Sequence, residues 1–94
     1  MTSKEILAIN LKYYRFLLNM TQEEFAHLTH TDLKYYIEME NGHKKPSIVM
    51  LDKLASEINR LANKNIVSTG DLITYFPEHK INKRRVDKKQ LYVL

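Results

Sequence analysis

The sequence predicts an all-α domain of five helices followed by a basic C-terminal tail. Apolar residues recur at helical spacing in two long segments, and residues that favour helix starts and stops stand at the segment ends. Val, Ile and Thr do not alternate over any long stretch, so a sheet is not indicated before the tail. We place the helical domain at residues 1–78 and the tail at residues 79–94.

The composition is that of one small domain. The chain has 94 residues, of which 44% are hydrophobic, and it contains no cysteine. This suits a modest core and excludes a disulfide framework or a thiolate metal site. No segment approaches the ~18 consecutive apolar residues of a membrane helix, and no signal-peptide pattern is present. We expect a cytoplasmic protein with no cofactor and no membrane partner.

The positive charge lies mainly in the tail. Residues 1–78 hold nine Lys and Arg against ten Asp and Glu, a net charge of −1. Residues 79–94 hold six Lys and Arg against one Asp, a net charge of +5. Charge alone is therefore weak evidence that the domain binds nucleic acid, and that case has to come from the arrangement of helices.

The first helix is expected from about Lys4 to Leu18, with Ser3 as its N-cap and Asn19 as a left-handed stop. One stripe at helical spacing is expected to be buried: Leu7, Leu11, Tyr14 and Leu18. A second apolar stripe also runs along this helix: Ile6, Ile9, Tyr13, Phe16 and Leu17. It indicates either unusually deep burial or a face that covers a subunit partner or the tail.

Two short helices joined by a tight turn follow. Thr21 and Glu24 form the reciprocal capping box that opens the second helix. The turn is expected near His30-Thr31, and Asp32 caps a third helix that stops at Gly42. This is the layout with which a small domain presents one helix to the major groove of DNA.

The fourth helix is expected to begin after Ser47 and to reach about Asn63. Seven residues are expected on its inner side: Ile48, Leu51, Leu54, Ala55, Ile58, Leu61 and Ala62. Ser68 and Asp71 form another capping pattern, which opens a short fifth helix that Pro77 stops.

Several motifs in a fixed order resemble one known family. They are Leu11-Lys12-Tyr13-Tyr14-Arg15, Thr21-Gln22-Glu23-Glu24-Phe25-Ala26, Met39-Glu40-Asn41-Gly42 with Pro46-Ser47, and Val67-Ser68 with Asp71-Leu72-Ile73. Over about residues 5–76 the chain resembles the Cro/CI-type (XRE-like, phage-repressor) helix-turn-helix domain. The resemblance implies a lambda-repressor-like fold of five helices, and usually a homodimer on a pseudo-palindromic double-stranded DNA operator. It also implies a partly buried structural ion pair between Arg15 and Glu40.

The chain departs from the family pattern in three places. His30 stands in the turn where the family favours Gly, so the turn must be adapted or the second helix must end differently. Residues 60–66 are an insertion that lengthens the fourth helix, so the family's dimer geometry cannot be carried over. The outward face of the third helix is unusually apolar.

That outward face would read the bases. With Asp32 as the cap, the residues facing the groove are Leu33, Lys34, Ile37 and Glu38, with Tyr35 beside them. Tyr36 and Met39 then point into the core. Lys34 would bind guanine or a phosphate, and Glu38 would accept a hydrogen bond from cytosine. Leu33 and Ile37 offer only apolar contact, best with a thymine methyl, so DNA shape is expected to contribute to recognition.

Other residues are candidates for contact with the phosphates of the DNA backbone. Gln22 at the start of the second helix resembles the family's phosphate clamp. Four residues after the third helix are expected to face the other strand: Asn41, His43, Lys44 and Lys45. The tail cluster Lys83-Arg84-Arg85 would add nonspecific contacts or act only as a solubilising arm.

We therefore predict a sequence-specific transcriptional regulator, a small dimeric repressor, and not an enzyme. There is no Gly-rich phosphate loop, and the only close histidine pair, His27 and His30, is more typical of a surface pair than of a metal site. The alternative is an antitoxin or a protein-binding helix-turn-helix module. Its partner protein would bind the apolar recognition face or the tail, which ends in Leu91-Tyr92-Val93-Leu94.

Overall fold

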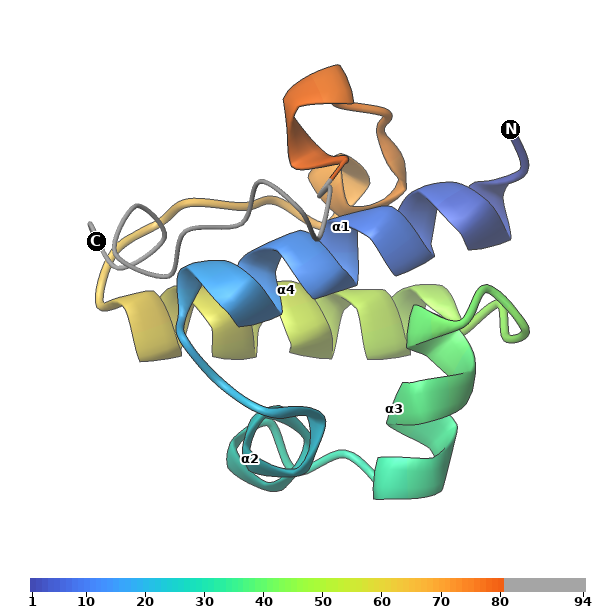
Figure 1. Ribbon diagram of the computed structural model, residues 1–94. Helices are drawn as coiled ribbons and strands as arrows, with labels where there is room; N and C mark the ends of the chain where they lie inside the picture. Colours follow the sequence, from blue (N-terminus) through green and yellow to red (C-terminus); the bar gives the residue numbers. More distant parts are fainter. Residues whose placement is uncertain (81–94) are drawn as a thin grey trace.

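The computed structural model describes residues 1–80, and the predictions made for positions 81–94 lie outside this part of the chain. The described part is entirely helical, with four α-helices and two short 3₁₀ helices (Figure 1). They are α1 (Ser3–Leu17), α2 (Gln22–Leu28), α3 (Leu33–Glu40), α4 (Ile48–Ala62), η1 (Gly70–Ile73) and η2 (Pro77–His79). The fifth helix is thus a 3₁₀ turn, and Pro77 begins a second such turn where we expected it only to end a helix.

The N-terminus of α1 corrects one prediction. The N-cap is Thr2 and not Ser3, and Thr2 forms a full capping box with Glu5. The Thr2 hydroxyl accepts from the Glu5 amide at 3.2 Å, while the Glu5 carboxylate accepts from the Thr2 amide at 2.9 Å. The pattern is the same Thr-x-x-Glu that the sequence analysis recognised at Thr21. At the other end, Asn19 takes the expected left-handed conformation with φ 57°.

Buried side chains from all four α-helices form one core, which Val67 and Leu72 extend. The helical members are Leu7, Leu11, Tyr14, Phe25, Ala26, Tyr36, Met39, Leu51, Leu54, Ala55 and Ile58. Four predicted inner positions differ. Leu18, Leu61 and Ala62 are only half-buried, and Ile48, the first residue of α4, is 71% exposed.

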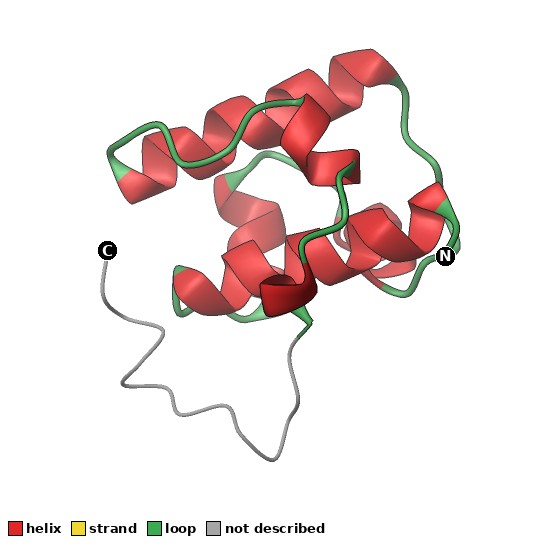
Figure 2. Cartoon of the chain, turned by 90° about the horizontal axis from the view of Figure 1, so that it is seen from above, coloured by secondary structure: helices red, strands yellow, loops and turns green. Residues whose placement is uncertain are grey.

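The segment after α4 returns to lie against α1 (Figure 1 and Figure 2), where a buried side chain of α1 fastens it. The Asn10 side-chain amide donates to the carbonyl oxygens of Asp71, Leu72 and Thr74 at 3.1, 2.8 and 2.9 Å. These contacts hold η1 and the residue after it against α1, although the Asp71 carbonyl also accepts from the Thr74 amide at 3.1 Å.

The second stripe of α1 is partly covered by this same segment. All five of its residues, Ile6, Ile9, Tyr13, Phe16 and Leu17, are half-buried. The ring of Tyr13 stacks on His79 with centroids 3.8 Å apart. His79 is itself buried, so packing against α1 continues one residue beyond position 78. The segment containing η1 and η2 thus covers part of the face for which we considered a subunit partner or the tail.

Candidate nucleic-acid interface

The recognition helix α3 is oriented by its two inward side chains. Asp32 caps it by accepting from the Tyr35 amide at 3.0 Å. Tyr36 and Met39 are fully buried, and the Tyr36 ring packs against Phe25 of α2 with centroids 5.1 Å apart. Because these contacts set the rotation of α3 about its axis, Leu33 and Lys34 are turned outward, whereas Glu40 is buried and Tyr35 packs partly against the core.

The structure brings the proposed base-reading residues to one outer side of α3. Leu33 is 38% exposed, and Lys34 is also exposed. Three more are half-buried along the same helix: Tyr35, Ile37 and Glu38. An apolar rim with one cation and one carboxylate can offer few polar contacts to base edges.

The turn between α2 and α3 is built without glycine. His30 itself takes the left-handed conformation, with φ 57°. Beside it, the buried hydroxyl of Thr29 donates to the Phe25 carbonyl at 2.7 Å and lies 3.1 Å from the hydroxyl of Thr31. The turn is therefore adapted, and α2 still ends at Leu28.

Two cations of α4 neutralise the carbonyl end of α2. Lys53 donates to the carbonyl of His30, and Arg60 donates to the carbonyl of Leu28 at 2.8 Å. These carbonyls lie where a helix has no internal donors left and carries partial negative charge. The two contacts fix α2, and through it the turn, against α4.

An ion pair ties the end of α3 to α1. Arg15 donates from Nε to Oε2 of Glu40 at 2.9 Å and from Nη2 to Oε1 at 2.6 Å. Burial disfavours the charge of Arg15, but hydrogen bonding and charge attraction to Glu40, with smaller contributions from Tyr36, together outweigh it and raise the pKa of Arg15. Burial, with the Glu40 carboxylate next in importance, holds the pKa of Tyr36 well above its ordinary value, so the phenol stays neutral.

Gln22 lies beside this pair. Its side-chain amide donates to Oε1 of Glu40 at 3.3 Å, so the start of α2 meets the end of α3. An amide has two hydrogens, which leaves one for a phosphate. The exposed carboxylates Glu23 and Glu24 follow directly and would repel the same phosphate.

The loop after α3 carries the best-placed cations. Asn41, His43, Lys44 and Lys45 are all exposed, and Gly42 reverses the chain with φ 78°. Pro46 is buried, which anchors the far end of the loop against the core. Two lysines beside the end of a protruding helix form the kind of arrangement that positions a protein on a phosphate backbone.

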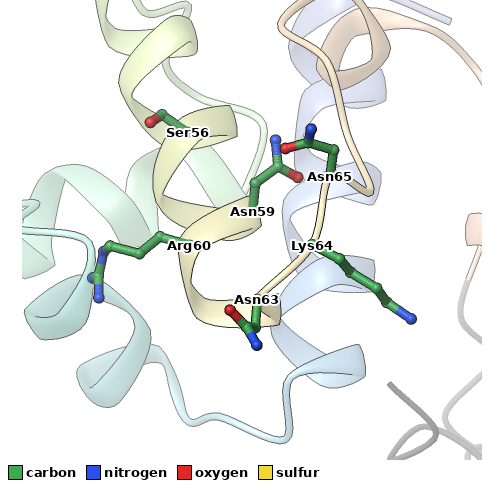
Figure 3. A pocket seen from close by; sticks show the side chains of 6 residues that line it. All are labelled: Ser56, Asn59, Arg60, Asn63, Lys64 and Asn65. Atoms are coloured by element: carbon green, nitrogen blue, oxygen red, sulfur yellow. The ribbon is translucent and has the colours of Figure 1, made fainter.

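A separate hollow of about 330 Å³ lies at the end of α4 (Figure 3) and is lined by Ser56, Asn59, Arg60, Asn63, Lys64 and Asn65. Two of its polar side chains already have partners in the fold. Asn59 accepts from the amides of Ile66 and Val67 at 2.8 and 3.0 Å, and Arg60 also pairs with Glu57 at 2.6 Å. The Asn59 contacts hold the segment that leads to η1, which is a structural task.

Within residues 1–80, no group of three or more His, Cys, Asp or Glu is arranged to hold a metal ion. Over the same residues, no helix has the length and apolarity needed to cross a membrane.

Sequence reasoning missed two residues of the surrounding structure, Asn10 and His79. Asn10 was detectable as a polar residue at the spacing of the buried stripe formed by Leu7, Leu11 and Tyr14. His79 carried no comparable local signal.

Comparison with known proteins gives one result. A family described as Helix-turn-helix matches residues 11–61, which run from the middle of α1 to the end of α4. No curated protein and no solved structure matches the chain.

Proposed function

Since this chain belongs to the Cro/CI-type (XRE-like) helix-turn-helix family, a family that binds DNA, we propose that it is a sequence-specific transcriptional regulator of double-stranded DNA. It acts as a small dimeric repressor that inserts α3 into the major groove. The observation that carries the proposal is the exposure of Leu33 and Lys34 on a helix whose opposite side is fixed in the core by Tyr36 and Met39.

Base reading is assigned to the outer side of α3. Lys34 contacts guanine O6 and N7 or a phosphate, and Glu38 accepts from a cytosine amine. Leu33 and Ile37 pack on thymine methyl groups, with Tyr35 at the edge of the contact. Each good polar base contact discriminates by about 1–3 kcal/mol, so two such contacts leave a substantial share of specificity to DNA shape.

Phosphate binding is assigned to the loop after α3. Asn41, His43, Lys44 and Lys45 contact one strand, and the free amide hydrogen of Gln22 contacts the other. The Arg15–Glu40 pair does not touch DNA in this scheme. It holds α3 at a fixed angle to α1, so that base and phosphate contacts form together.

The test is binding to duplexes obtained by selection from a random pool, measured across a series of salt concentrations. We expect enrichment of a defined site, and an affinity whose logarithm falls linearly with the logarithm of salt as counterions are released from the phosphates. Failure to enrich any site, or an affinity that does not change with salt, would overturn the proposal.

A second function has one observation in its favour. Leu33 and Ile37 place two aliphatic side chains on the recognition face, and such a face also suits contact with a partner protein. In that case the chain is a protein-binding module or an antitoxin, and substitutions of Leu33 would reduce partner binding while leaving affinity for random duplex DNA unchanged.

A further inference from the structure

The most exposed large apolar side chains in the described part of the chain stand together at the start of α4. Ile48 is 71% exposed and Val49 is 77% exposed. They are the first two residues of α4, so they belong to a different helix from the base-reading face of α3. Aliphatic side chains left this open on consecutive positions indicate a contact surface.

A pocket opens directly beside them. Its volume is about 240 Å³, enough for one aliphatic side chain. Leu7, Pro46 and Leu51, which are buried, contribute its floor, and the more exposed Ile48 and Ile73 contribute its walls. The surface therefore combines a projecting side chain, Val49, with an adjacent apolar recess.

The charges around these two features are opposite. The residues that line the pocket include Lys4 and Lys45 and no carboxylate. Val49 lies one turn before Asp52, which is exposed on the same side of α4 and whose carboxylate also accepts from the Thr69 hydroxyl at 2.6 Å. The neighbouring cation Lys53 is turned away, because it donates to the carbonyl of His30. The projecting side is thus acidic and the recess is basic.

From this arrangement we infer that a second copy of the chain docks here, with Val49 of each copy inserted into the pocket of the other. A two-fold interface requires one surface to carry both halves of the contact, and this surface carries a projection beside a recess. Each insertion brings Asp52 of one copy toward Lys4 and Lys45 of the other, so both halves attract. The contact is made twice.

The inference deepens the proposed function, because it names the surface through which two copies would join on DNA. Lys45 borders both the pocket and the proposed phosphate-binding loop. Docking at this point places the two loops on either side of the two-fold axis, with one α3 beyond each loop. Three exposed aliphatic residues are few for an interface that typically covers about 800 Å² per partner, so we expect a weak dimer that adjacent half-sites strengthen.

The first test is the mass in solution, measured by sedimentation equilibrium over a wide range of concentration. The wild-type chain is expected to rise from monomer toward dimer mass, and Val49→Asp to remain monomeric. Its dissociation constant should increase roughly a hundredfold or more, since two-fold symmetry counts the lost apolar contact twice. Leu28→Asp is the matched control, because Leu28 is 38% exposed at the end of α2 and should leave the dissociation constant unchanged.

The second test exchanges charges between copies. Lys4→Glu/Lys45→Glu and Asp52→Lys should each be monomeric alone, because like charges then meet in both contacts. Their equimolar mixture should form a heterodimer at near wild-type affinity, since each contact again joins opposite charges. Circular dichroism melting shows whether each variant is folded. If Val49→Asp is not folded, the conservative variant Val49→Thr replaces it in the sedimentation experiment.

Three results would overturn the inference. They are a wild-type chain that remains monomeric throughout, a Val49→Asp variant that still dimerises, and a mixture that stays monomeric. A monomer whose residues 81–94 cover the pocket would give the first result. Failure of the proposed function is a separate outcome, in which the dimer forms as described but enriches no DNA site. If only the dimer contact is wrong, the chain should still bind a single half-site.

Discussion

Glu40, the last residue of α3, accepts two hydrogen bonds from Arg15 of α1, at 2.9 and 2.6 Å. The side chain of Glu40 is 1% exposed and that of Arg15 is 10% exposed. Arg15 also donates to the Met20 carbonyl at 3.0 Å, just before α2 begins. One guanidinium therefore joins the elements on both sides of the helix-turn-helix, and the orientation of α3 depends on it.

The first prediction is that Glu40→Ala lowers the free energy of unfolding by about 3–5 kcal/mol, because it leaves the buried Arg15 charge unpaired. Glu57→Ala is the matched control. It breaks the Arg60–Glu57 pair, in which the Arg60 side chain is 55% exposed, and should cost only about 0–1 kcal/mol. Urea unfolding followed by circular dichroism measures both. Equal losses in the two variants would mean that the buried pair has no special role.

The turn between α2 and α3 gives a second prediction. His30 holds φ 57°, a left-handed conformation that disfavours side chains, so His30→Gly should stabilise the domain by roughly 0.5–1 kcal/mol. His27→Gly, three residues earlier and inside α2, should instead destabilise it by about 1 kcal/mol. Thermal melting of the two variants compares them directly. A loss of stability on His30→Gly would show that the imidazole contributes more than its backbone strain costs.

A third prediction concerns pH. Asn10 uses its amide hydrogens on carbonyls, so its oxygen faces His79, whose Nδ1 donates to it at 2.9 Å. Burial lowers the pKa of His79 below 6.5, against the opposing charges of Glu78 and Asp71. The unfolded chain then binds the proton more readily, so the stability due to His79 is complete above pH 6.5 and decreases as pH falls through its folded pKa.

Unfolding measured in urea from neutral pH downward tests this. His79→Gln can still donate to Asn10 but cannot titrate, and it should show a shallower loss of stability below pH 6.5 than the wild-type chain. Curves that stay parallel across this range would show that His79 is equally basic in the folded and unfolded states.

The fourth prediction separates phosphate contact from base reading. Lys44→Ala and Lys45→Ala should each lower the affinity for all duplexes to a similar degree. Each should also reduce the slope of log affinity against log salt concentration by about one. Glu38→Ala should leave that slope nearly unchanged and alter preference at one base position. Selection of sites from a random pool with each variant reads out both effects. An unchanged preference for Glu38→Ala would remove it from the base-reading set.

Much of the fold could be predicted because its helix ends are decided locally. The capping box at Thr21, the Asp32 and Ser47 caps, the left-handed Asn19, and the end of α4 near Asn63 all depend on residues within one turn. Such interactions leave a signature in adjacent sequence positions.

What could not be predicted depends on distant contacts. The attachment of η1 to α1 depends on three carbonyls bound by Asn10, 61–64 positions away, and the burial of His79 follows from a contact spanning 69 positions. The exposure of Ile48 was not predictable either, because periodicity shows which side of α4 is apolar but not which part of that side the rest of the fold covers. For the same reason, the sequence could not decide what covers the second apolar stripe of α1.

The central claim is that the outer side of α3 enters the major groove, and backbone amide NMR spectra recorded during titration with a selected duplex test it most directly. We expect changes in amide chemical shift to be concentrated at Leu33, Lys34, Ile37 and Glu38 and at the loop from Asn41 to Lys45. The amide signals at the far end of α4 should not shift. Shifts confined to other surfaces, with α3 unchanged at saturation, would contradict it.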